Sequence, residues 1–542
     1  MRVENPILRG FHPDPSPVLA RGEYYIAVST FEWFPGVRIY RSQDLAHWTY
    51  TCAPLDSEDK MVLEGTMGSD GVWAPHLSFD GERFYLLYTV VHGARRHPVM
   101  DVDNFLISAP DITGPWSQPV YLNSSGFDPS LFHGEDGRKW VLNMEWDWRK
   151  VCWGENPFTG ILLQEYSPER EKLVGEPKKI FPGSPIGSTE GPNLFQRDGY
   201  YYLCTAEGGT GFFHAATVAR SRNLTGPYEL HPDNPVLTSW DGGWEDTAGE
   251  LARRGTGAVR LKKAGHATFF QAKNGSWYLA HLCARELGDT HCCPLGREAA
   301  LERVVWRDGW PYLEGNKHPK DWVEVPGEGE PIPEPGRESK VYTFDTDAFW
   351  ADFQTLRAAP EKVGVTTREQ PGVLRIYGQE SVFSRFRQGL VARRVTQLHA
   401  RAETVFRFAP DSFQQAAGLI CRYDEDNQYF AHITWDEQLS RTVARLLAVD
   451  RGQARLLEQV PLEGPQYHLG VDIQGEQVQF TFWQQGEKRP LGGPLETKVL
   501  SDDHADGFTG LFVGMAVQDL NEHSKYADFL SFTYAASEQG DV

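Results

Sequence analysis

The chain contains few cysteines and no long apolar segment. Among its 542 residues there are seven cysteines, and the only close pair, Cys292 and Cys293, has neither a disulfide nor a metal-ligand spacing. A disulfide framework is therefore not expected. The first residues lack the apolar core of a signal peptide, and no stretch of about 18 apolar residues occurs anywhere. These absences predict a cytoplasmic protein without a membrane span.

Positive charge is scarce as well. The chain has 53 Lys and Arg residues against 74 Asp and Glu residues, which gives a formal net charge of -21. Such a surface repels phosphate backbones and anionic lipids over long range. Nucleic-acid binding and membrane-surface binding are therefore not expected. A neutral or cationic small ligand is consistent with this charge.

Aromatic residues are abundant, at 17 Trp, 21 Tyr and 30 Phe. This content is typical of all-β chains and of sites that stack flat faces. Much of it belongs to an internal repeat, in which a glycine turn leads into an alternating, aromatic-rich strand. Each copy predicts a β-hairpin. The copies lie at residues 22–28, 81–88, 137–142, 199–203 and 275–280.

A second shared element, a short polar turn that opens the preceding strand, lies just before each glycine. Its copies recur at intervals of about 50 to 75 residues, which fits a five-bladed β-propeller. The longest interval contains Ser239 to Gly257, which we interpret as an insertion. In a propeller, the residue that opens each innermost strand lies at the mouth of the central channel. The five opening residues are Asp14, Ala74, Asp128, Glu190 and His266.

Three carboxylates around one channel could bind a metal, hold a polar ligand or perform acid and base chemistry. Oxygen ligands favour Ca²⁺ or Mg²⁺, but no contiguous DxDxDG loop is present. A glycosidase needs one protonated and one ionised carboxyl group. Glu190, followed by apolar residues, suits the acid, and Asp14, on a proline-rich turn, suits the ionised base. Single acids before Pro or Gly are usually turn formers, but a shared repeat position favours a functional role.

Aromatic side chains cluster in sequence near these turns. Their flat faces can stack on the C–H faces of sugar rings, and they suit a neutral polyhydroxyl ligand better than an anion. Most of them are expected to be propeller core. Phe31, Trp73 and Trp146 are the three that we predict to be site residues on this basis.

Eight ordered motifs resemble glycoside hydrolase family 43, in particular its two-domain β-xylosidases, and the resemblance covers nearly the whole chain. A single Asp-Pro pair would carry no information, whereas eight motifs in the same order are highly specific. They lie at residues 12–16, 29–37, 71–75, 123–133, 189–192, 205–211, 264–266 and 294–298.

The resemblance implies an inverting, single-displacement mechanism that needs no cofactor. It assigns Asp14 as the general base, Glu190 as the general acid and Asp128 as the carboxylate that tunes and orients the acid. Arg297 matches an arginine that contacts sugar hydroxyls and the carboxylates. His266 matches a histidine that in some members holds a divalent cation, Ca²⁺, in the channel through water. The positions that match sugar contacts are Phe31, Trp73, Ala74, Phe127, Trp146 and Thr210.

A second domain follows the repeat. Residues 1–323 are assigned to the propeller, the Pro-, Gly- and Glu-rich residues 324–340 to a linker, and residues 341–542 to a β-sandwich of the jelly-roll, concanavalin-like type. Alone, such a domain suggests a carbohydrate-binding module. The resemblance instead implies that a loop bearing Phe508 closes one wall of the pocket. A pocket closed in this way admits only a chain end.

We therefore expect an exo-acting β-xylosidase on short β-1,4-xylooligosaccharides, assembled as a homo-dimer or homo-tetramer. Residues 267–271 and Asn193 depart from the usual β-xylosidase pattern, so the metal dependence and the choice between xylose and arabinose stay open. One alternative is an α-L-arabinofuranosidase or an enzyme with both activities. Another is a non-catalytic sugar-binding propeller. A retaining fructan hydrolase would need Asn-Asp-Pro and Arg-Asp-Pro motifs, which do not occur.

Overall fold

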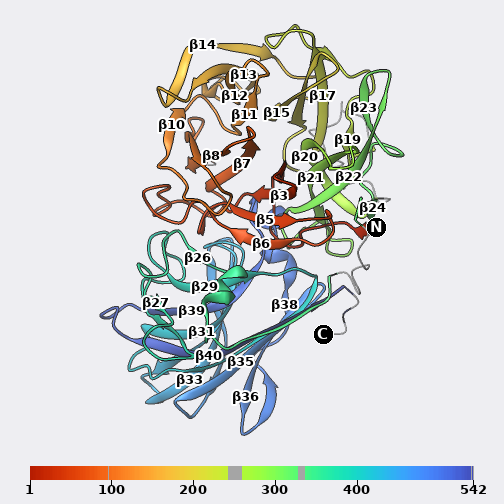
Figure 1. The fold of residues 1–542 in the computed structure, drawn as a ribbon. Helices are drawn as coiled ribbons and strands as arrows, with labels where there is room; N and C mark the ends of the chain where they lie inside the picture. Colours follow the sequence, from red (N-terminus) through yellow and green to blue (C-terminus); the bar gives the residue numbers. More distant parts are fainter. Residues whose placement is uncertain (95–96, 242–258, 328–335, 539, 541–542) are drawn as a thin grey trace.

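The structure is a computed structural model that describes residues 1–94, 97–241, 259–327, 336–538 and 540. Nearly all regular elements are β-strands, arranged in two domains that lie one above the other in Figure 1. Most of the predicted insertion at Ser239 to Gly257 lies outside the described residues, as do residues 328–335 of the predicted linker. β24 ends at Glu324, and β25 begins at Glu338.

The first domain is a five-bladed β-propeller, as predicted. Each blade is an antiparallel sheet whose strands pair in chain order, and the fourth blade carries one extra short strand. In the first blade, the short β4 between the second and third strands is not part of the blade sheet. The blades are β2 (Ser16–Ala20), β3 (Glu23–Val28), β5 (Arg38–Ser42) and β6 (Thr49–Cys52); β7 (Gly71–Phe79), β8 (Phe84–His92), β9 (Asp101–Ala109) and β10 (Val120–Asn123); β11 (Ser130–His133), β12 (Lys139–Trp146), β13 (Phe158–Ser167) and β14 (Lys172–Phe181); β15 (Glu190–Arg197), β16 (Tyr200–Glu207), β17 (Ala215–Ser221), β18 (Glu229–Leu230) and β19 (Leu237–Thr238); and β20 (Leu261–Gln271), β21 (Trp277–Arg285), β22 (Glu298–Arg307) and β23 (Trp310–Leu313).

The repeated glycines lie in the hairpins that join the first and second strands of the blades, and all have positive φ. Because a left-handed conformation costs glycine little, these turns recur at the same place in each blade. The members are Gly22, Gly81, Gly137, Gly199 and Gly275. The two ends of the domain meet where β1 (Arg2–Glu4) pairs antiparallel with β24 (Trp322–Glu324).

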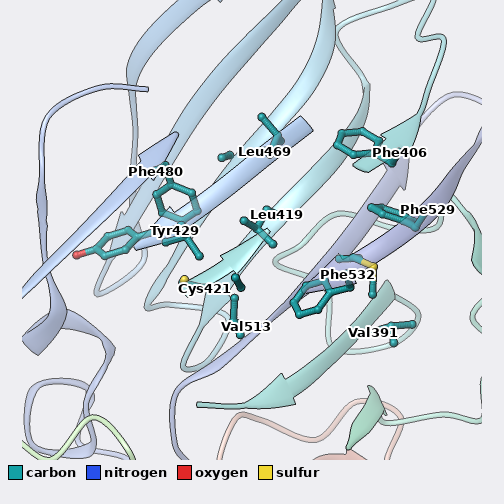
Figure 2. Packing of buried hydrophobic residues seen from close by; sticks show 14 of the residues in the cluster. Val391, Phe406, Leu419, Cys421, Tyr429, Leu469, Phe480, Val513, Phe529 and Phe532 are labelled. Atoms are coloured by element: carbon teal, nitrogen blue, oxygen red, sulfur yellow. The ribbon is translucent and has the colours of Figure 1, made fainter. Parts of the chain in front are cut away.

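The second domain is a sandwich of two antiparallel sheets, which confirms the predicted class. Side chains from the inner faces pack into one core, where Phe406, Phe529 and Phe532 lie near Leu419 and Val513 (Figure 2). One sheet comprises β25 (Glu338–Tyr342), β27 (Val365–Thr366), β28 (Leu374–Tyr377), β30 (His399–Arg407), β35 (Gln466–Gln474), β36 (Gln477–Gln484), β37 (Glu487–Pro490), β38 (Leu495–Glu496) and β40 (Tyr526–Ser537). The other comprises β26 (Phe353–Leu356), β29 (Gly389–Arg394), β31 (Gln415–Arg422), β32 (Gln428–Asp436), β33 (Arg441–Asp450), β34 (Gln453–Pro461) and β39 (Phe512–Asp519).

The second sheet also includes a strand of the propeller. β4 (Trp33–Phe34), between the second and third strands of the first blade, pairs antiparallel with β26. Trp33 is fully buried and stacks on Phe512 of β39, with ring centroids 3.8 Å apart and planes 14° apart. The first blade and the sandwich therefore share both backbone hydrogen bonds and an aromatic contact.

Helical segments are short. Within the described ranges they are α1 (Trp148–Cys152), α2 (Asp502–Ala505), η3 (Asp347–Ala351) and η4 (Thr497–Leu500). In the described part of the chain, no helix has the length and hydropathy needed to cross a membrane.

Candidate active site

A pocket of about 240 Å³ lies where the inner strands of the blades begin, and Phe508 of the sandwich forms part of its wall. Every site residue predicted from the sequence lines this one pocket. The predicted residues found there are Asp14, Phe31, Trp73, Ala74, Phe127, Asp128, Trp146, Glu190, Thr210, His266, Arg297 and Phe508.

The opening residues of the blades share an unusual backbone conformation. Asp14, Ala74, Asp128 and His266 have φ of 55°, 37°, 57° and 43°. Non-glycine residues rarely adopt such values, and they concentrate at functional sites. In the fourth blade the residue with this conformation is Gly191, at 55°, so Glu190 lies one position before the equivalent of Asp14. The sequence alignment of the repeats placed Glu190 at the shared position, which is wrong by one residue.

Asp14 is held as a carboxylate. Its Oδ2 accepts a hydrogen bond of 2.6 Å from the Ser29 hydroxyl, and Oδ1 lies 3.6 Å from Nη1 of Arg297 and 3.7 Å from Nδ1 of His266. Burial on its own would raise the pKa of Asp14. The charges of Arg297 and His266, with the Ser29 hydrogen bond, outweigh burial and bring the pKa below its usual value. Asp14 is therefore ionised at neutral pH.

Glu190 has the opposite environment. It is 6 % exposed, and burial together with the negative charges of Asp128 and Asp14 raises its pKa well above the usual value. Arg297 opposes this shift only in part. Asp128 is also buried, and its Oδ2 accepts a hydrogen bond of 2.9 Å from the backbone N–H of Gly191. One pocket thus contains a carboxyl group whose pKa is lowered, Asp14, and a carboxyl group whose pKa is raised well above its usual value, Glu190.

Aromatic rings form a large part of the wall. The ring of Trp73 lies 5.8 Å from the rings of Phe31 and Phe508 and 5.6 Å from that of Phe127. The indole N–H of Trp73 donates to the carbonyl oxygen of Ser69, whose hydroxyl accepts from the backbone N–H of Phe508. These rings are therefore fixed by both packing and hydrogen bonds.

The pocket has further lining residues that the sequence reasoning did not identify. Phe158, at the start of β13, lies 5.3 Å from Trp146 in an edge-to-face contact. Gly209 directly precedes Thr210 in the motif at residues 205–211, so its position beside a predicted site residue was a usable signal. Ser29 lies in the motif at residues 29–37, but the sequence did not predict its hydrogen bond to Asp14. The additional lining residues are Ala94, Met100, Phe158, Ser188 and Gly209.

The channel below the carboxylates was predicted to hold Ca²⁺ through His266. Calcium takes about six to eight oxygen ligands. In the described ranges, no group of three or more His, Cys, Asp and Glu side chains is placed to hold a metal ion. Direct coordination by such a group therefore does not fit the described residues, and the water-mediated role of His266 stays a prediction.

Comparisons with known proteins agree with this geometry. Residues 3–311 match the model for glycosyl hydrolases family 43, and residues 341–535 match that for the β-xylosidase C-terminal concanavalin A-like domain. The chain is 42% identical to a β-xylosidase of Bacillus subtilis (98% and 99% of the two chains covered) and 41% identical to xylosidase/arabinosidase 43B of Humicola insolens (98% and 97%). The crystal structure of a xylan β-1,4-xylosidase from Bacillus halodurans superposes with a TM-score of 0.90 at 44% identity, covering 98% of this chain and 100% of that one. With two carboxyl groups of opposite pKa shift in one aromatic pocket and both domains matched, the chain belongs to glycoside hydrolase family 43.

Proposed function

We propose that this glycoside hydrolase is an exo-acting, inverting β-xylosidase that releases xylose from the non-reducing end of short β-1,4-xylooligosaccharides. The observation that carries the proposal is that Asp14 and Glu190, in a single pocket, have pKa shifts of opposite direction. The names of the Bacillus relatives support xylose as the sugar.

The size of the pocket supports exo action. Its volume of about 240 Å³ is below the range of about 300–1,000 Å³ usual for drug-sized ligands, which suits one sugar ring. Trp73, Phe127 and Phe508 would bind the apolar faces of that ring. Arg297, whose Nη2 donates to the Phe508 carbonyl, closes the side facing the sandwich. A polysaccharide chain would have to end in this pocket rather than pass through it.

In the proposed reaction, water attacks the anomeric carbon while the glycosidic bond breaks. The carboxylate of Asp14 accepts a proton from the water, and the carboxylic acid of Glu190 donates a proton to the leaving oxygen. Asp128 acts on the acid, because its negative charge favours the protonated form of Glu190. Arg297 and Ser29 keep Asp14 ionised before the attack.

The stereochemistry of the product tests this mechanism. Xylobiose is added to the enzyme in an NMR tube, and the first anomer of the released xylose is recorded before mutarotation. Inversion of a β-linkage gives α-xylose. β-Xylose as the first product would show retention and exclude the roles given to Asp14 and Glu190.

The acid is tested with Glu190→Gln on two substrates. General acid catalysis contributes roughly 10²- to 10⁴-fold. We expect a loss of this size on xylobiose and a much smaller loss on an aryl β-xyloside, whose phenolate leaves without protonation. The same variant serves as its own control for folding, since the aryl substrate must still be hydrolysed. Equal losses on both substrates would contradict the assignment.

The second candidate is an α-L-arabinofuranosidase, alone or combined with xylosidase activity. The name of the Humicola relative, a xylosidase/arabinosidase, favours it. The values of kcat/KM for aryl β-xyloside and aryl α-L-arabinofuranoside decide between the two sugars. Repeating both assays with a chelator and with added Ca²⁺ tests the proposed role of His266.

The proposal also includes a cytoplasmic location and assembly as a homo-dimer or homo-tetramer. All seven cysteines are free, which suits a reducing compartment such as the cytoplasm. Light scattering of the purified protein tests the proposed homo-dimer or homo-tetramer.

A further inference from the structure

Glu207 is a fully buried residue at the end of β16, next to the proposed active site. Its backbone is fixed by pairing with Ala215 of β17. Gly209 and Thr210, which follow it in the chain, line the pocket, whereas Glu207 itself does not. It is therefore close to the pocket but not part of its wall.

The carboxyl group of Glu207 accepts hydrogen bonds from both ends of one loop. The loop, residues 182–189, joins β14 to β15 and leads directly into Glu190. At its start, the backbone N–H of Ser184 donates to Oε1 at 2.8 Å, and the Ser184 hydroxyl donates to Oε2. At its end, the Thr189 hydroxyl donates to the same Oε1 at 2.8 Å. One side chain therefore holds the two ends of the loop together.

The loop is packed closely around these contacts. A Cβ atom on Gly183 would lie 2.2 Å from the hydroxyl oxygen of Thr189, closer than a side chain can approach, and φ of Gly183 is 100°. The backbone N–H of Gly208 donates to the carbonyl oxygen of Gly187 at 2.9 Å. Thr189 is itself buried. The loop thus has little room to follow another path while Glu207 is in place.

Glu190 needs such support because the regular part of its strand ends before it. β15 and β16 pair without interruption from Asn193 to Arg197, but the register shifts between Glu190 and Asn193. Pro192 lies in this interval and has no N–H to donate to the neighbouring strand. Glu190 pairs with Ala206 beyond the irregularity. The position of Glu190 therefore depends on the loop before it as well as on the strand after it.

We propose that Glu207 is a positioning residue for the general acid, because it holds the loop that sets the place of the Glu190 carboxyl group. The inference rests on the proposed function, in which Glu190 donates the proton. Glu207 acts only through Ser184 and Thr189 and does not contact the substrate. Misplacement of a reacting group by about 1 Å can cost about 100-fold in rate. A loop held less firmly is therefore expected to slow the step that needs the acid.

Glu207→Met tests the proposal on two substrates. Methionine has a similar length, but its sulfur is only a weak acceptor, so both ends of the loop lose their anchor. We expect kcat/KM on xylobiose to fall about 10- to 100-fold. The loss on an aryl β-xyloside, whose leaving group needs no proton, is expected to be several times smaller. A purely structural role would lower both activities by the same factor, and that result would overturn the proposal.

Thr189 provides a milder test and its rescue. Thr189→Val keeps the shape of the side chain but removes the hydroxyl that donates to Glu207, whereas Thr189→Ser keeps that hydroxyl. We expect Thr189→Val to lose about tenfold on xylobiose, with a smaller loss on the aryl substrate, and Thr189→Ser to resemble the wild type. If Glu207→Met does not fold, this pair decides the question. Equal activities of the two Thr189 variants on xylobiose would contradict the proposal.

Glu302 of β22 is the matched control. It is another buried carboxyl group of the propeller and lies outside the pocket wall. It accepts a hydrogen bond of 2.6 Å from the backbone N–H of Lys320. Glu302→Met is expected to lower Tm and to change both activities by the same factor. A selective loss on xylobiose in this variant would show that the effect does not come from the loop, and would also count against the proposal.

Glu190→Gln, measured beside these variants, separates the inference from the function on which it rests. Equal losses on both substrates in Glu190→Gln would refute the acid itself, and the role of Glu207 with it. A selective loss on xylobiose in Glu190→Gln, without one in Glu207→Met or Thr189→Val, would leave the acid in place and refute the positioning role alone. We expect selective losses in all three.

Discussion

Arg297 of the propeller donates a hydrogen bond of 3.2 Å to the backbone carbonyl of Phe508 in the sandwich. The guanidinium also lies 5.5 Å from the ring centre of Phe508, and its other terminal nitrogen is 3.6 Å from Asp14. One side chain thus both lowers the pKa of Asp14 and helps to hold the sandwich loop over the pocket. Closure of the pocket and activation of the proposed base depend on the same residue.

Phe508→Ala is predicted to weaken substrate binding with a smaller effect on the chemical step. The ring is part of the pocket wall and contacts Trp73 edge-to-face at 5.8 Å, but it carries no proton for the reaction. We expect KM for an aryl β-xyloside to rise about tenfold, which corresponds to about 1.4 kcal/mol. Phe413→Ala, at an exposed phenylalanine of the same domain outside the pocket, is the control and should leave KM unchanged.

Ser29→Ala is predicted to shift the acidic limb of the profile of kcat/KM against pH to higher pH. The Ser29 hydroxyl donates to Asp14 and so favours its ionised form. Without this bond the pKa of Asp14 rises, and activity is lost at a higher pH as the solution is made more acidic. The measurement is kcat/KM against pH for wild type and variant. An acidic limb that stays in place or moves downward would exclude Asp14 as the group that must be ionised.

Asp128→Asn is predicted to shift the alkaline limb of the same pH profile to lower pH. The negative charge of Asp128 raises the pKa of Glu190, so its removal lowers that pKa. The proton on Glu190 is then lost at a lower pH, and activity declines earlier as pH rises. The measurement is kcat/KM against pH with xylobiose as the substrate, because cleavage of xylobiose requires the proton from Glu190. Movement of the alkaline limb to higher pH would contradict the proposed coupling between Asp128 and Glu190.

The sequence predicted the propeller and most of the pocket because both follow from repetition. Glycine turns such as Gly22 and Gly81 recur once per blade, so the opening residues of the blades could be brought to one axis without coordinates. The resemblance carried by the eight ordered motifs then assigned roles to individual residues. The one-residue error at Glu190 arose because Gly191, not Glu190, has the left-handed conformation of the repeat.

Contacts between the domains could not be predicted in this way. The pairing of β4 with β26 joins strands more than 300 residues apart, and two residues are too short to give an alternating pattern. Arg38 of β5 likewise donates a hydrogen bond to the backbone carbonyl of Ala351 in η3, although the two residues lie far apart in the sequence. Phe158 and Met100 belong to no motif, so their place in the pocket depends on how the blades pack.

Lys263 makes another contact between the domains. This residue of β20 is 2% exposed, and its Nζ lies 2.9 Å from Asp502 and 2.7 Å from Asp503 in α2. Asp503 also accepts a hydrogen bond from the backbone N–H of Cys293. The helix α2 directly precedes the loop that carries Phe508, so Lys263 ties the start of that loop to the propeller.

Lys263→Met is predicted to destabilise the protein and to loosen the pocket. Removing one partner of a buried ion pair costs about 3–5 kcal/mol, because the remaining charge is left without a counterion. We expect a decrease of this size in the free energy of unfolding, measured with urea, and a higher KM in the folded variant. Arg441→Met breaks the exposed pair with Glu463 and should cost about 0–1 kcal/mol without changing KM. Equal effects of the two substitutions would show that Lys263 does not hold the domains together.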